Sequence, residues 1–221
     1  MPAPSPDTPV LTTRGRTLDH AAEVYDWLAP VMTLGQEGRY RKRAISLLDL
    51  RGHERVLDVG CGTGVLTRLI AQRLTAADAC AVGLDAAPKM IDVARRRAAG
   101  LPRLRFDAGV AESLAHPDAS FDCAVSTFFF HHIDAELKRR SLAELLRVLK
   151  PGGRLVIVDV DVPTNWFGKL CAWSGYWLFK QEEIRENIRG ELGRALADTP
   201  FREVTRVAHY SGYVTVFLAI K

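Results

Sequence analysis

Hydrophobic and polar positions change period repeatedly between residues 53 and 160. Short apolar runs, which predict buried strands, alternate with stretches whose apolar residues recur at helical spacing. We expect the strands at Val56–Val59, Cys80–Leu84, Leu104–Phe106, Phe121–Val125 and Leu155–Val160. We expect the helices at Leu66–Leu74, at Pro88–Ala99 and over a stretch that ends at Leu149. This alternation predicts a parallel sheet with helices on both faces.

The segment before the first strand carries no strand pattern. Four prolines and no apolar run within Met1–Pro9 predict a disordered tail over residues 1–16. Residues 17–50 have helical spacing and predict a helical cap, in which Pro30 separates a first helix from a second at about Gly38–Leu50.

The segment after the last parallel strand ends in a hairpin. Glu203–Ala208 and Tyr213–Ile220 are apolar runs joined by a short turn, and so close a connection predicts an antiparallel pair. Residues 162–200 show no strand pattern, and we interpret them as an insertion that caps the substrate. Residues 17–221 therefore form a single domain.

A glycine-rich loop follows the first predicted strand. Glycines occur there at every second position and a helix begins directly after them: Gly60, Gly62 and Gly64. Glycine lets a ligand approach bare backbone. The dinucleotide fingerprint does not fit, because Val65 stands where its third glycine would be. The loop instead suits a ligand with an amino-acid portion, with Asp58 near its ammonium group.

Asp85 ends the second predicted strand. A carboxylate at this place in such a sheet binds ribose hydroxyls, although an aspartate before a helix is also typical of an N-cap. Together with the glycine loop, Asp85 favours ribose binding.

The order of these motifs resembles class I S-adenosylmethionine-dependent methyltransferases. The resemblance covers residues 56 to 160 and rests on Asp58–Gly64, Asp85, Gly109–Glu112, Phe121–Asp122 and Leu149–Gly153. It implies an α/β, Rossmann-like, doubly wound sheet of seven strands with the last strand antiparallel, and S-adenosyl-L-methionine as cofactor. The amino-terminal cap is similar to that of the ubiquinone and menaquinone C-methyltransferase family.

The same resemblance implies a set of cofactor-binding residues. These are Asp58, Gly60, Cys61, Gly62, Asp85, Ala86, Met90, Val110, Ala111, Glu112 and Ser126. Asp58, Gly60 and Gly62 would hold the methionine part, and Asp85 the ribose. The family usually has an aspartate at position 110 for the adenine amino group. Val110 departs from this, so the adenine either loses this hydrogen bond or finds it elsewhere, at Asp107 or Glu112.

Two adjacent histidines follow the fourth predicted strand, at the edge where ligands bind. His131 and His132 are the candidates for a catalytic base, since histidine exchanges protons near neutral pH. In an extended chain the two side chains would point in different directions, and we prefer His132 for the position facing the acceptor. No third ligand at useful spacing suggests a metal site, and none is expected.

Aromatic residues are concentrated between Trp166 and Phe179. Trp166, Leu170, Trp173 and Trp177 share one helical face. Three interpretations remain open, namely a helix packed on the core, the wall of an apolar substrate pocket, and a helix lying on a membrane with Lys169 and Lys180 at the head groups.

Composition limits the function further. The formal charge is +4 and the sequence pI about 9.0, but no recognition motif for nucleic acid accompanies the basic residues. Four scattered cysteines, no signal peptide and no membrane span indicate a cytoplasmic protein. We therefore expect methyl transfer to a small-molecule or lipid-like acceptor, with peripheral membrane contact and oligomeric state left open. The alternatives are a homologue that binds cofactor without transfer, and a phospholipid or amine N-methyltransferase.

Overall fold

The computed structural model describes Thr13, Gly15 and residues 35–221. Apart from those two residues, the predicted tail and the first helix of the cap lie outside the described residues. The second cap helix is confirmed as α2, Glu37–Leu48.

The sheet has seven strands in the order β3-β2-β1-β4-β5-β7-β6. The first five are parallel, and β7 is antiparallel to both β5 and β6, as the resemblance implied. Their bounds are β1 Arg55–Val59, β2 Cys80–Asp85, β3 Leu104–Ala108, β4 Phe121–Thr127, β5 Leu149–Val160, β6 Glu203–Tyr210 and β7 Val214–Ile220.

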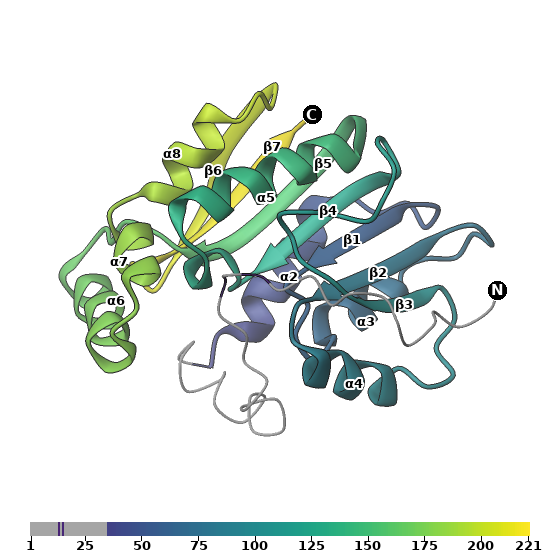
Figure 1. Ribbon diagram of the computed structural model, residues 1–221, viewed down its shortest axis with the longest axis horizontal. Coiled ribbons are helices and arrows are strands. Elements are labelled where there is room, and N and C mark those ends of the chain that lie inside the picture. The colour runs from purple at the N-terminus through teal and green to yellow at the C-terminus, as the bar shows by residue number, and fades with distance from the viewer. Residues whose placement is uncertain (1–12, 14, 16–34) are drawn as a thin grey trace.

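Helices cover both faces of this sheet (Figure 1). Apolar side chains of α5 and α8 form one core with the sheet, and those of α2, α3 and α7 form the other, as strand alternation requires. Helix α4 packs beside β3, and α6 contributes the buried Ala172 to the second core. The bounds are α3 Val65–Ala71, α4 Pro88–Arg97, α5 Ala135–Val148, α6 Trp166–Phe179, α7 Glu182–Ile188 and α8 Glu191–Asp198.

Strand β5 begins six residues earlier than the apolar pattern predicts. Lys150–Gly153 has the composition of a turn, and Gly152 has a positive φ of 77°. These residues nevertheless belong to the strand as a bulge, because the register jumps from Phe121↔Leu149 to Cys123↔Arg154. The Gly152 N–H donates to the Lys221 carbonyl at 2.9 Å. The Lys221 N–H donates to the Gly153 carbonyl at 3.0 Å, so Lys221 satisfies backbone groups of both glycines of the bulge.

The insertion between β5 and β6 contains three helices, α6, α7 and α8. It contains no strand, which agrees with the pattern. No helix in the described part of the chain is long and apolar enough to cross a bilayer. A cytoplasmic location stays a prediction.

The ring of Phe106 fixes the distance between β3 and the glycine loop. It lies where side chains at Gly64 and Gly83 would otherwise be, since a Cβ at either position would come within 2.4–2.5 Å of the ring. Packing at interior density leaves no room for an added methyl group. The two glycines therefore let the aromatic ring pack beneath the loop that forms the site.

We predict that Gly83→Ala lowers the free energy of unfolding by about 1–3 kcal/mol, because the methyl group overpacks the Phe106 contact. Gly38→Ala is the matched control. Gly38 is exposed within α2 and a Cβ there meets nothing within 4 Å, so alanine should raise stability by up to about 1 kcal/mol. Urea denaturation measures both. Equal changes in the two variants would contradict the packing argument.

Candidate functional site

The glycine loop folds back onto the end of β2. The backbone N–H groups of Gly60 and Cys61 both donate to the Leu84 carbonyl, at 2.8 and 3.1 Å. Gly60 and Gly62 have φ values of 71° and 53°, in the left-handed region that favours glycine. A Cβ at Gly62 would meet nothing within 4 Å, so this backbone is open to a ligand.

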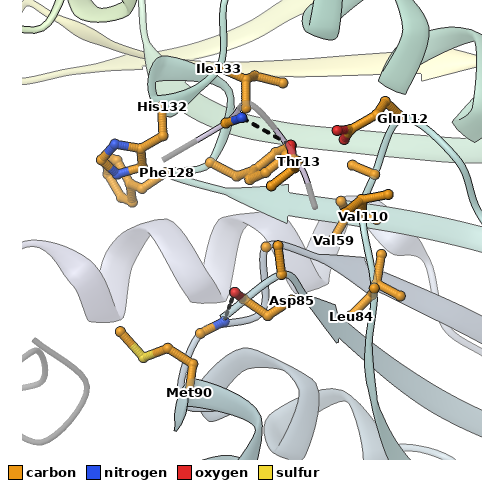
Figure 2. A pocket seen from close by; sticks show the side chains of 17 residues that line it. Thr13, Val59, Leu84, Asp85, Met90, Val110, Glu112, Phe128, His132 and Ile133 are labelled. Carbon is orange, nitrogen blue, oxygen red and sulfur yellow. Dashed lines mark hydrogen bonds between the residues drawn. The ribbon is translucent and has the colours of Figure 1, made fainter. Parts of the chain in front are cut away.

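Asp85 connects this loop to the start of α4. Its Oδ2 accepts from the Gly62 N–H at 2.8 Å (Figure 2). Its Oδ1 accepts from the Ala87 N–H at 2.9 Å. The N-cap residue of α4 is Ala87 rather than Asp85. The carboxylate lines the cavity described below, and each of its oxygens can accept a further hydrogen bond. This arrangement suits the ribose interpretation.

A cavity opens between the glycine loop, the loop after β3 and the short 3₁₀ helix η2, Phe130–His132 (Figure 2). Phe128 and His132 lie on the opposite side from Val110 and Glu112. Thr13 and Gly15 from the amino-terminal segment also line it. Most of the predicted cofactor-binding residues are brought together here, namely Gly60, Gly62, Asp85, Ala86, Met90, Val110, Ala111 and Glu112.

Because valine stands at position 110 in place of the family's usual aspartate, the wall of the cavity is apolar there. Val110 is buried and lines the cavity, and so does Glu112. Asp107 lines neither cavity described here, and it pairs with Arg105 at 2.9 Å. Of the two substitutes considered for the adenine amino group, Glu112 is therefore the one at the cavity.

Asp58 and Ser126, also predicted to bind the cofactor, lie on neighbouring strands β1 and β4 and line neither cavity described here. Both are buried. Asp58 Oδ2 accepts from Thr67 Oγ1 at 2.7 Å, but among the described residues Asp58 Oδ1 and Ser126 Oγ have no hydrogen-bond partner. Burial raises the pKa of Asp58 to about 7. The Thr67 hydrogen bond opposes this shift, and the Asp85 carboxylate adds to it. A buried acceptor without a partner is costly, so this pair suits a donor or cation from a ligand.

A second cavity adjoins the other side of the glycine loop. Cys61 lines it, together with Tyr40 and Arg41 of α2. The Arg41 guanidinium pairs with Glu37 at 2.6 Å and lowers the pKa of Asp58. Burial raises the pKa of the Cys61 thiol well above its usual value, which disfavours the reactive thiolate.

His131 forms a buried dyad with Asp159 at the end of β5. Nδ1 lies 2.7 Å from Asp159 Oδ1, and Asp159 Oδ2 accepts from the Phe130 N–H at 2.7 Å. A carboxylate at this distance favours the tautomer in which Nδ1 donates to it, and that tautomer leaves a lone pair on Nε2. The His131 side chain is 11% exposed.

The two histidines lie in the helical segment η2 rather than in an extended chain, but only one of them lines the cavity. Their ring centroids lie 4.0 Å apart. His132 lines the cavity, as predicted, and His131 lies directly behind it with its ring centroid 6.3 Å from that of Phe128.

Several residues at the site were not identified from the sequence. Thr67 and Phe128 carry no motif. Arg41 was not singled out either, although its spacing from Glu37 is that of a helical ion pair. No group of three or more metal-binding side chains is placed for a metal in the described residues, and independence from metal stays a prediction.

Comparison with known proteins gives the class. Residues 56–153 match the family model of the methyltransferase domain. The demethylmenaquinone methyltransferase of Symbiobacterium thermophilum is 34% identical over 211 residues, covering 90% of this chain and 82% of that protein. The demethylmenaquinone methyltransferase of Thermus thermophilus is 39% identical over 142 residues, covering 63% of this chain and 62% of that protein.

The fold agrees with this. The crystal structure of an S-adenosylmethionine-dependent methyltransferase from Aquifex aeolicus superposes with a TM-score of 0.67 at 20% identity, covering 93% of this chain and 99% of that one. The fold and the cavity are those of an S-adenosylmethionine-dependent methyltransferase. Within that class, the chain belongs to the family that contains the demethylmenaquinone methyltransferases.

We predict that Asp85→Ala weakens S-adenosylmethionine binding roughly a hundredfold, because two charge-assisted hydrogen bonds of about 1.5 kcal/mol or more each are lost. Isothermal calorimetry measures the dissociation constant. Asp107→Ala is the matched control, since it ends the neighbouring strand but lines neither cavity described here. An unchanged dissociation constant in Asp85→Ala would refute the ribose assignment.

Cofactor affinity should also depend on pH through Asp58. A ligand ammonium binds the ionised carboxylate, and the pKa of Asp58 without ligand is about 7. Affinity should therefore rise from pH 5.5 toward pH 7 as the proton leaves. Thr67→Val removes the hydrogen bond that lowers this pKa, so the rise should shift to higher pH. The same titration profile in Thr67→Val and wild type would contradict this assignment.

Proposed function

We propose that this methyltransferase acts on an aromatic, quinol-like lipid acceptor, with the His131–Asp159 dyad as its base. The dyad carries this proposal, because an acceptor carbon or oxygen must lose a proton when it gains a methyl group. His131 lines neither cavity itself but is in ring contact with His132, which does, and one of its ring nitrogens is hydrogen-bonded to a buried carboxylate.

The two cavities lie on either side of the glycine loop and share Gly60, Gly62 and Phe128, and their residues fit the parts of the cofactor. Arg41 would hold the methionine carboxylate and Asp58 the ammonium group, while Asp85 would hold the ribose. Bound S-adenosylmethionine supplies an activated methyl group on a sulfonium. Ala111, whose backbone N–H has no acceptor among the described residues, would bind the adenine ring beside Met90.

Arg41 and Asp58 together favour a ligand that carries both a negative and a positive charge over a ligand that is only a cation. Arg41 presents donors to a carboxylate, and Asp58 Oδ1 presents a buried acceptor. Their opposite charges are already close enough for Arg41 to lower the pKa of Asp58. A ligand that carries both an ammonium and a carboxylate would satisfy both groups at once.

The dyad would act by a balanced proton transfer. The acceptor carbon or oxygen forms a bond to the methyl group while the carbon–sulfur bond breaks, and the acceptor proton passes to His131 Nε2. The Asp159 carboxylate stabilises the imidazolium that results. Three groups surround the buried Asp159 carboxylate within hydrogen-bond distance, namely His131 Nδ1 and the backbone N–H groups of Phe130 and Val160.

Two observations support the acceptor class. The walls near the dyad are apolar and aromatic, with Phe128, Phe129 and Ile133 lining the cavity. The relatives named above are demethylmenaquinone methyltransferases, which are so named for a quinone-type acceptor. An aromatic ring would stack or pack edge-on against such side chains.

We predict that His131→Ala lowers kcat for a demethylmenaquinol-type acceptor by roughly 10²–10⁴-fold while the cofactor dissociation constant stays unchanged. Asp159→Asn should lower kcat as well, because the amide no longer stabilises the imidazolium. His53→Ala is the matched control, an exposed histidine remote from the cavity, and should leave kcat unchanged.

The comparison with His132→Ala decides between the two histidines. A larger loss of kcat in His132→Ala than in His131→Ala would give the base to His132 and overturn the dyad. Turnover with amines but not with quinols would favour an N-methyltransferase. Tight cofactor binding with no S-adenosylhomocysteine formed from any acceptor in the panel would favour a homologue without transfer activity.

A further inference from the structure

We propose that α6 docks this protein on the surface of an anionic lipid bilayer, lying in the plane of the interface. The proposal goes beyond the methyl transfer reaction and does not depend on the identity of the acceptor.

Exposed apolar surface is concentrated on this helix. In the described part of the chain, seven large apolar side chains are exposed, and six of them lie between Val162 and Leu178. Trp166 is 78% exposed, Leu170 61%, Trp177 72% and Leu178 77%. Soluble proteins rarely expose a contiguous patch of this kind without a partner for it.

The exposed residues form a stripe because of helical spacing. Trp166, Leu170 and Trp177 stand at i, i+4 and i+11, the same face of an α-helix. Trp173, which shares that face, is half-buried. Neither cavity described above is lined by a residue of α6. Of the three interpretations of this segment, a surface helix therefore fits the observed exposure best.

The opposite side of α6 is anchored to the protein. A Cβ at Gly168 would lie 2.0 Å from the Gly212 carbonyl oxygen, so helix and β6–β7 turn are in direct contact. Ala172 is buried in the core. The Asn165 side chain caps the helix by accepting from the Gly168 N–H at 2.7 Å. Because these contacts fix the opposite side of α6 to the protein, the exposed stripe faces outward on a helix that is packed against the fold.

Charge around the stripe favours an anionic surface. From Val162 to Lys180 there are two lysines, Lys169 and Lys180, both exposed, and no aspartate or glutamate. At the start of α7, the carboxylate of Glu182 is exposed but paired with Arg185, and Glu183 is half-buried.

A second basic element lies beside the amino-terminal end of α6. Helix α2 meets the same β6–β7 turn, through a Gln36–Ser211 hydrogen bond and a ring contact of Tyr40 with Tyr210 at 5.2 Å. Arg39 and Lys42 of α2 are exposed. Each basic group near a membrane surface adds about 1 kcal/mol of attraction to anionic lipid.

The dimensions fit an interfacial helix. Fourteen residues span about 21 Å, which is too short to cross a hydrocarbon core of about 30 Å. Tryptophan is the residue most typical of the membrane interface. The helix follows directly after β5, at the carboxyl edge of the sheet that also holds the cavity (Figure 1). Docking through α6 would bring that edge near the membrane.

The test is co-sedimentation of the full chain with phosphatidylcholine vesicles, with and without phosphatidylglycerol, in the absence of cofactor and acceptor. The wild type should partition onto the anionic vesicles and be released by salt. Trp166→Ala combined with Trp177→Ala should weaken partitioning about a hundredfold, at about tenfold for each indole. Lys169→Gln with Lys180→Gln should weaken binding to anionic vesicles and not to neutral ones.

Val204→Ser is the matched control, the one exposed large apolar side chain outside this region among the described residues. It should bind vesicles as the wild type does. An unchanged melting temperature and cofactor affinity would show that the tryptophan variant is folded. Equal vesicle partitioning of variant and wild type would overturn the proposal. A second result would also overturn it. If the wild type formed a concentration-dependent dimer and did not bind vesicles, and if the tryptophan substitutions dissociated that dimer, the stripe would bind a second copy of the chain instead of lipid.

Discussion

The geometry of the site depends on two hydrogen bonds that the Asp85 carboxylate accepts, one from the glycine loop and one from the backbone before α4. The same carboxylate accepts from the Gly62 and Ala87 N–H groups and so fixes the glycine loop against the start of α4. Since the loop contains residues with positive φ, few other residues could replace its glycines. A ligand that adds hydrogen bonds to Asp85 therefore meets a carboxylate whose position is already set, which lowers the ordering cost of binding.

A second group of buried polar contacts connects the loop of the proposed base, His131, to the helical insertion between β5 and β6. Lys138, fully buried on α5, donates to the Ile133 carbonyl at 2.5 Å and to Glu186 of α7 at 3.1 Å. Burial lowers the pKa of Lys138, and Glu186 opposes the shift. The loop that carries the histidines is thereby tied to the helices that follow β5, so a change in α7 would be felt at the His131–Asp159 dyad.

Helix α6 and the cavity lie at the same edge of the sheet, but we assign membrane binding to the helix and methyl transfer to the cavity. The cavity is lined by backbone, apolar side chains and a few polar groups, and α6 takes no part in either cavity described here. An enzyme whose acceptor is a lipid must recover it from a bilayer, and a helix in the interface would hold the reaction edge where such acceptors are found. The two proposals are compatible, yet each can fail alone.

The sequence by itself determined the fold class, the parallel order of the first strands and the cofactor loop. These depend on periods of two and 3.6 residues and on glycines at fixed places, which are local properties of the chain. It did not determine the bulge in β5, because the partner of Gly152 is the last residue, Lys221. Nor could it pair His131 with Asp159, 28 residues away, or assign Arg41 to the cavity. Whether an arginine faces solvent or a ligand, and whether a tryptophan is buried or exposed, depends on which elements pack together, and only the tertiary structure decides that.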